Sequence, residues 1–177
     1  MTERRQQAVI GIAGWKNSGK TTLAVRLIGE LTRRGYCVSS LKHAHHDFQI
    51  DTAETDSARH RRAGAREVAI VSPDRWAVIA ELKGRPEPSL EEMLARLAAC
   101  DIVVVEGFKR APIAKIEARR GVGLSRPPLS PSDPDIIAIA ADHVVADATV
   151  PVYDLDDIAG LADLVLKRLG LVGRGAS

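Results

Sequence analysis

The sequence predicts an α/β fold of the P-loop NTPase type, in which helices flank a mostly parallel sheet that carries a β-hairpin insertion. Short apolar runs alternate with amphipathic or polar segments along most of the 177 residues, an order typical of parallel strands joined by crossover helices. Two β-rich runs separated by Pro73-Asp74-Arg75 predict the hairpin. We expect a single domain over residues 1–177, with a core from about 8 to 170 and short flexible tails.

The first predicted strand runs directly into a phosphate-binding sequence. Residues 8–13, Ala-Val-Ile-Gly-Ile-Ala, are almost wholly apolar, as in a strand buried on both faces. Residues 14–21 read Gly-Trp-Lys-Asn-Ser-Gly-Lys-Thr and match the G-x-x-x-x-G-K-[ST] pattern of the P-loop, or Walker A, motif. Leucines every four residues then predict a helix that stops at Gly35. This order predicts a nucleoside triphosphate at a helix N-terminus.

Each fixed position of this loop has a mechanical role. Gly14 and Gly19 permit backbone conformations that turn successive N–H groups toward a phosphate. Lys20 would bring its ammonium to the β- and γ-phosphates, and the Thr21 hydroxyl would complete the coordination sphere of Mg²⁺. The predicted nucleotide-binding residues of this segment are Gly14, Lys16, Asn17, Ser18, Gly19, Lys20, Thr21 and Thr22.

The rest of the chain predicts further strands and helices in alternation. Strands are expected over residues 36–41, 67–72, 76–82, 101–107, 113–118, 136–140 and 150–153, and helices over 56–63, 89–99 and 157–169. The run 101–107, Asp-Ile-Val-Val-Val-Glu-Gly, carries the strongest β signal. Four prolines and two glycines over residues 121–134 predict a loop.

Two acidic residues lie at or just beyond the carboxyl ends of predicted buried strands, at the sheet edge where open α/β folds bind ligands. Glu106 is expected to hold Mg²⁺ directly or through water, with an exposed strand-end acid as the alternative. Lys109 either contacts nucleotide or substrate or is a solvated lysine. Asp142 lies where many P-loop GTPases carry an acid that accepts from guanine N1–H and N2–H₂, although the usual Asn-Lys-x-Asp form is missing.

Residues 42–47, Lys-His-Ala-His-His-Asp, form an unusual polar segment after the second predicted strand. The segment could bind a transition metal, since imidazole suits zinc and nickel. It could instead place Asp47, Asp51 or Asp56 against Mg²⁺ or a water, or be a polar surface loop. The predicted catalytic residues are Lys20, Asp47 and Glu106, and the predicted metal ligands are Thr21, Asp56 and Glu106.

The bulk composition restricts the partners and the compartment that we expect. Apolar residues make up 45% of the chain and the net charge is +2, which gives no case for nucleic acid or an anionic membrane as partner. No apolar run approaches the roughly 20 residues that cross a bilayer. Cys37 and Cys100 lack metal-type spacing and are expected to be buried thiols in a reducing compartment, so we predict a cytoplasmic protein. Arg59, Arg62 and Arg66 either receive an anionic substrate or form a solvated helix face.

Several of these segments together resemble the MobB family, the GTP-binding adaptors of molybdopterin guanine dinucleotide biosynthesis. The resemblance extends from about residue 9 to 169 and rests on residues 14–21, 42–48, 56–59, 63–65 and 105–109. It implies a P-loop fold, a homodimer, binding of GTP with Mg²⁺ and weak GTPase activity. It also implies that the protein assists a MobA-type enzyme, which joins GMP to molybdopterin.

The resemblance assigns roles to individual residues. It implies that Lys20 and Thr21 serve the phosphates and Mg²⁺, that Glu106 is the second acidic position, and that Asp142 contacts guanine. Because Trp15 stands where a related class of P-loop proteins has lysine, Lys16 is not assigned the intersubunit role of that class.

The leading hypothesis is a GTP-binding adaptor that hydrolyses GTP slowly. Slow turnover is expected because the sequence shows no clear glutamine for orienting water and no unmistakable arginine finger. Two alternatives are a P-loop small-molecule kinase and a nickel-type metallocentre maturation GTPase, the latter prompted by His43, His45 and His46.

Overall fold

The computed structural model describes residues 7–44, 48, 50–52, 54–121, 127–146 and 148–171. The chain forms two compact units, Met1–His43 with Leu90–Ser177 and Ala44–Ser89. Within the described residues, no helix is both long enough and apolar enough to cross a bilayer. The tails predicted beyond residues 8–170 lie almost entirely outside the described residues.

The first unit is built on a six-stranded sheet with the order β2-β5-β1-β6-β7-β8. Its strands are β1 (Ala8–Ala13), β2 (Val38–Lys42), β5 (Ile102–Glu106), β6 (Lys115–Arg119), β7 (Ile136–Ala141) and β8 (Val152–Asp154). Every described pair in this sheet is parallel. The carboxyl ends of the strands therefore meet at one edge, which is where ligands bind in open α/β sheets.

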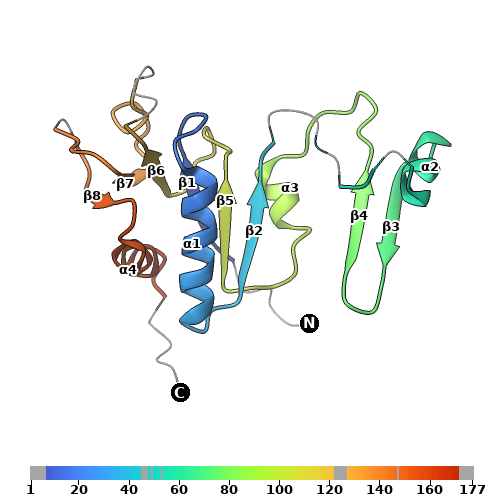
Figure 1. The fold of residues 1–177 in the computed structure, drawn as a ribbon, viewed down its shortest axis with the longest axis horizontal. Coiled ribbons are helices and arrows are strands. Elements are labelled where there is room, and N and C mark those ends of the chain that lie inside the picture. Colours follow the sequence, from blue (N-terminus) through green and yellow to red (C-terminus); the bar gives the residue numbers. More distant parts are fainter. Residues whose placement is uncertain are drawn as a thin grey trace. The chain divides into compact units, whose positions relative to one another are not determined.

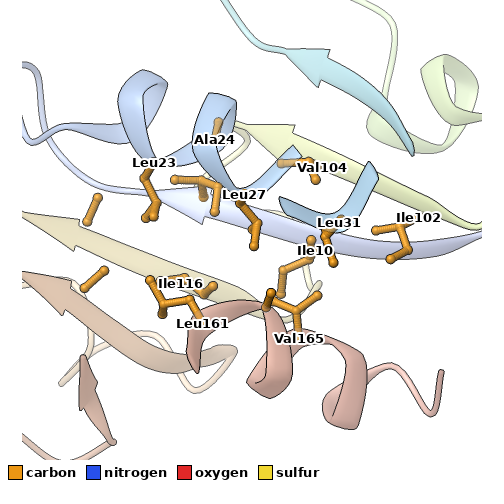
Figure 2. Packing of buried hydrophobic residues seen from close by; sticks show 14 of the residues in the cluster. Ile10, Leu23, Ala24, Leu27, Leu31, Ile102, Val104, Ile116, Leu161 and Val165 are labelled. Atoms are coloured by element: carbon orange, nitrogen blue, oxygen red, sulfur yellow. The ribbon is translucent and has the colours of Figure 1, made fainter. Parts of the chain in front are cut away.

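Helices cover both faces of this sheet. Figure 1 shows α1 lying against one of them. The helices of the unit are α1 (Lys20–Arg33), α3 (Leu90–Leu94) and α4 (Ile158–Arg168). The leucine stripe of α1 packs with β1 and α4 into the larger apolar cluster, whose members Leu27, Ile10 and Leu161 appear in Figure 2. Alternate side chains of β5 point to opposite faces: Val104 joins this cluster and Val105 joins the one under α3. Burial on both faces explains the uninterrupted apolar strand sequences.

The second unit contains the predicted hairpin and one short helix. Its elements are α2 (Asp56–Arg62), β3 (Glu67–Val71) and β4 (Trp76–Ala80), and the two strands pair antiparallel. The Ser72 N–H donates to the Arg75 carbonyl oxygen at 2.8 Å and closes the turn. Arg61 links the ends of this unit because its guanidinium pairs with both Asp51 and Glu81.

The predicted fold class is confirmed, with a parallel sheet flanked by helices and a separate small hairpin sheet. The helix predicted over 89–99 is shorter in the structure, because α3 ends at Leu94 and tighter turns follow it. Leu97 then packs with Leu94 into the cluster under α3, so tertiary packing overrides helix propensity there. Residues 122–126 of the proline-rich loop lie outside the described part.

Two smaller expectations about individual side chains are wrong. Cys37 is exposed and Cys100 is only half-buried, although both were predicted to be buried. Cys37 is exposed because β2 begins at Val38, later than predicted, so that Cys37 lies before the strand. The Cys37 N–H is held by the Asp101 carboxylate at 2.9 Å. Arg66 does not share a helix face with Arg59, because α2 ends at Arg62.

Candidate nucleotide-binding site

The loop between β1 and α1 has a backbone that only its particular residues permit. Gly14, Asn17 and Gly19 have φ angles of 146°, 65° and 91°, in the region that favours glycine and tolerates asparagine. A Cβ at Gly14 would lie 2.7 Å from the Ala118 carbonyl oxygen and would also strike the Ser18 side chain. The glycine is therefore needed for both its conformation and its close packing against β6.

The amino terminus of α1 lacks the side-chain capping that α2 and α4 have. Thr55 caps α2 by accepting from the Ala58 N–H, and Asp157 caps α4 by accepting from the Gly160 N–H. At Gly19 no side chain caps α1, and its first turn contains no acidic residue. The first N–H groups of α1 are therefore left for another acceptor, and the helix dipole favours an anion there.

The Ser18 hydroxyl adds a second sign that the loop fits a ligand. Its oxygen is buried and has no hydrogen-bond partner among the described residues. Buried polar atoms are nearly always satisfied, by protein, water or a bound group, so this hydroxyl is consistent with a ligand at the loop. Together with the uncapped helix, this hydroxyl fits the oxygens of a polyphosphate.

Thr21 and Glu106 meet at the edge of the sheet beside this loop. The Thr21 hydroxyl donates to the Glu106 carboxylate at 2.7 Å. A hydroxyl and a carboxylate are hard oxygen ligands of the kind that Mg²⁺ prefers, so this pair fits the predicted metal ligands. Lys42 reaches the same two groups, with its Nζ 3.3 Å from the Thr21 Oγ1 and 3.4 Å from the Glu106 Oε1.

The sequence did not single out Lys42 as a site residue. Its position follows from the register of β2 and β5, which places Lys42 directly opposite Glu106. The signal lay in the motif that begins at Lys42, but pairing of these two strands cannot be read from a local pattern. The order of the strands therefore places Lys42 at the site, which no local sequence pattern indicates.

Three lysines give the site an excess of positive charge. Lys20 donates from Nζ to the Trp15 carbonyl oxygen at 2.6 Å, and Lys109 lies over the Trp15 ring at 4.0 Å. Burial lowers the pKa of Lys20 below the ordinary lysine value of 10.5, and Lys109 and Lys42 lower it further, against the opposing effect of Glu106. The arrangement fits an anion, because a bound anion would relieve this repulsion.

A buried lysine positions the segment that carries Lys109. Lys115 is only 1% exposed and donates to the carbonyl oxygens of Lys109 and Ala111 at 3.2 and 2.8 Å. Its charge is balanced by Asp133 at 2.9 Å. Lys109 itself was predicted, whereas its support by Lys115 was not.

Asp142 follows β7 at the same sheet edge. Its Oδ1 accepts from the Gly121 N–H at 2.8 Å and lies 3.1 Å from the His143 Nδ1. These contacts, that with His143 first, lower the pKa of the Asp142 carboxyl. The group is therefore held ionised, as an acceptor for two donors must be.

The other predicted residues occupy more scattered positions. Lys16 lies exposed on the loop, and Thr22 is exposed on the first turn of α1. Asp56 belongs to the second unit, where Arg59 pairs with it at 3.6 Å, and its metal role stays a prediction. Asp47 lies outside the described residues.

The histidine-rich segment is only partly described. The His43 ring stacks on the Phe108 ring with 4.6 Å between centroids, whereas His45 and His46 lie outside the described residues. In the part of the chain that the structure describes, no three His, Cys, Asp or Glu side chains form a group that could hold a metal. The nickel-type hypothesis therefore gains no support from the described residues.

Comparison with known proteins identifies the family. Residues 9–142 match the family model of molybdopterin guanine dinucleotide synthesis protein B. The chain belongs to the MobB family. This match covers the chain from the phosphate loop at Gly14 to Asp142, and so includes Thr21, Lys42, Glu106 and Lys109.

MobB relatives resemble the chain over nearly its whole length. The molybdopterin-guanine dinucleotide biosynthesis adapter protein of Escherichia coli is 37% identical over 161 residues, covering 90% of this chain and 91% of the relative. The protein of that name from Haemophilus influenzae is 37% identical over 164 residues, covering 90% and 88%. A crystal structure of MobB superposes with a TM-score of 0.70 at 26% identity, over 92% of this chain and 99% of that one. The crystal structure of Bacillus subtilis MobB superposes with a TM-score of 0.69 at 27% identity, over 92% of this chain and 98% of that one.

The lowered pKa of Lys20 predicts a proton uptake when a polyphosphate binds. A bound phosphate favours the charged ammonium and raises the pKa of Lys20, so binding takes up protons between the lowered value and 10.5. Affinity for a polyphosphate should therefore fall as the pH rises through this interval. Calorimetry in alkaline buffers of different ionisation enthalpy measures the uptake.

A Lys109→Met variant is the control for this prediction. Removing the neighbouring ammonium should raise the pKa of Lys20 and move the uptake to higher pH. Proton release on binding, or the same pH dependence in both proteins, would contradict the assignment.

Proposed function

We propose that this MobB-family chain binds GTP with Mg²⁺, hydrolyses it slowly, and acts as an adapter in molybdopterin guanine dinucleotide biosynthesis. In this role it assists a MobA-type enzyme in attaching GMP to molybdopterin in the cytoplasm. One observation carries the proposal. The phosphate loop ends in an uncapped helix N-terminus, and beside it the Thr21 hydroxyl lies 2.7 Å from the Glu106 carboxylate. The relatives from Escherichia coli and Haemophilus influenzae are both named as adapter proteins of this pathway.

The chain's own residues divide the work of binding the nucleotide. The N–H groups at the start of α1 donate to the phosphates, and the Lys20 ammonium exchanges the Trp15 carbonyl oxygen for a phosphate oxygen. Thr21 and Glu106 hold Mg²⁺, which neutralises phosphate charge when it is bound. Asp142, ionised through its contacts with His143 and Gly121, accepts from the two guanine donors.

The position of Gln7 is consistent with slow hydrolysis. The chain has three glutamines, Gln6, Gln7 and Gln49, of which only Gln7 lies within the described residues, and its amide donates to the Ala98 carbonyl oxygen. Gln7 precedes β1, so it lies at the opposite end of that strand from the phosphate loop. It cannot orient a water at the γ-phosphate, which is the usual role of glutamine in fast GTPases.

The first test is nucleotide affinity in variants of the two ends of the site. Lys20→Ala should weaken GTP·Mg²⁺ binding by about 10- to 100-fold, because a charge-assisted contact is lost. Asp142→Asn should weaken GTP binding but not ATP binding. Lys167→Ala, on the exposed last turn of α4, is the charge-matched control.

Two results would count against this assignment. Equal or tighter binding of ATP by the wild-type protein would remove the guanine assignment. Turnover of nucleotide only after addition of a small-molecule acceptor would favour the kinase alternative.

The adapter role predicts a nucleotide-dependent complex. The wild-type chain should retain a MobA-type nucleotidyltransferase in a pull-down with GTP, and retain more than without it. Lys20→Ala should show no such gain, since it lacks the nucleotide. Retention that is equal in all four conditions would separate partner binding from GTP and refute this coupling.

We further propose that the second unit mediates a homodimer. Val71 and Trp76 lie opposite each other at the hairpin end and are 81% and 73% exposed, and Val78 is also exposed on the same face of the hairpin. Such an apolar patch is typical of an interface. A two-stranded sheet is marginal alone and leaves pairing groups free on its outer edges. A second copy would supply both matching edges and matching apolar side chains.

The homodimer can be tested by light scattering after size exclusion. A Val71→Asp/Trp76→Ser variant should shift the wild-type dimer toward monomer, because it places polar groups in the apolar contact. Val144→Ser, at a side chain that is 91% exposed in the first unit, should leave the mass unchanged. A monomeric wild-type protein, or a dimer that the hairpin variant does not disturb, would refute the proposal.

A further inference from the structure

We infer that Arg120 binds the part of the nucleotide that GTP and GDP share, on the guanine side of the phosphate loop. The inference rests on the proposed GTP binding and adds a contact that the loop motif does not contain. Arg120 directly follows β6, whose last residue is Arg119. Three observations carry it: its contact with the loop, the lack of an anionic partner for it among the described residues, and its place in the sheet order.

The Arg120 side chain lies against the start of α1. A Cβ built at Gly19 would be 2.9 Å from the Arg120 Nε and 3.5 Å from its Cζ. The guanidinium therefore covers the Cα of Gly19, the residue at which the uncapped helix begins. An anion bound at these N–H groups would lie beside a guanidinium that is already in place.

Arg120 lacks a carboxylate among the described residues, although it is half-buried. Its neighbour Arg119 pairs with Glu117 at 2.9 Å and donates to Ser130. Arg26 and Arg34 pair with Asp156 and Asp163. A half-buried cation without a partner is unfavourable unless an anion or an aromatic face reaches it, and a nucleotide supplies both.

The strand order places Arg120 on one definite side of the loop. β5 lies on one side of β1 and ends at Glu106, whereas β6 and β7 lie on the other side (Figure 1). The residue after Arg120, Gly121, donates its N–H to the Asp142 carboxylate at 2.8 Å. A nucleotide that reaches from Mg²⁺ at Glu106 to guanine at Asp142 crosses Gly19, and Arg120 faces its guanine-proximal part.

Buried contacts hold the strand that leads into Arg120. Glu117 is 1% exposed and accepts from the N–H groups of Leu129 and Ser130, each at 2.9 Å. Arg119 donates to Glu117 from the same strand. The end of β6 is thereby held in place, and no ion pair of Arg120 with another described residue is needed to keep it at the loop.

The test compares GTP·Mg²⁺ and GDP·Mg²⁺ affinity in Arg120→Gln, measured by displacement of a fluorescent guanine nucleotide. Loss of a charged contact should weaken both by about tenfold, and by the same factor, because the contact is shared. Arg120→Lys keeps the charge and should lie between wild type and Arg120→Gln. Arg168→Gln, exposed at the end of α4, should bind as wild type, and thermal unfolding checks that each variant is folded.

The outcomes separate this inference from the proposed function. Unchanged affinity in Arg120→Gln, a loss confined to GTP, or no advantage of lysine over glutamine would overturn the role of Arg120. If wild type binds GTP and Lys20→Ala does not, these results leave the proposed function standing. If wild type itself does not bind GTP, the proposed function fails first.

Discussion

The uncapped amino terminus of α1 is the constraint around which the first unit is arranged. Its N–H groups have no side-chain acceptor, and such groups are costly unless a partner satisfies them. The glycines of the loop let the chain approach β6 closely enough to leave this end open. Thr21 on the first turn then reaches Glu106, because β5 is the neighbour of β1.

Charge at this edge is distributed unequally between cations and anions. Lys42 and Lys109 lower the pKa of Lys20, and Glu106 opposes their effect. By contrast, charges below the edge are paired, as Lys115 with Asp133 is. Paired buried ions hold loops in position, whereas the excess of positive charge at the edge favours an anionic ligand.

Trp15 connects the phosphate loop to two segments that come much later in the chain. Its indole N–H donates to the Pro127 carbonyl oxygen at 2.8 Å, and its ring lies under the Lys109 ammonium. Lys109 is in turn supported by buried Lys115. The second position of the motif, which is free in the general pattern, thus anchors the loop to its surroundings.

Local sequence was sufficient for the strand–loop–helix core and for the hairpin. The β1 run, the glycine loop and the leucine stripe of α1 depend on side-chain periodicity and on glycine conformations, which are properties of neighbouring residues. The pairing of Lys42 with Glu106, and the contact of Arg120 with Gly19, depend on strand order and register. Only tertiary structure decided these, because the sequence pattern says which runs are strands but not which strands pair.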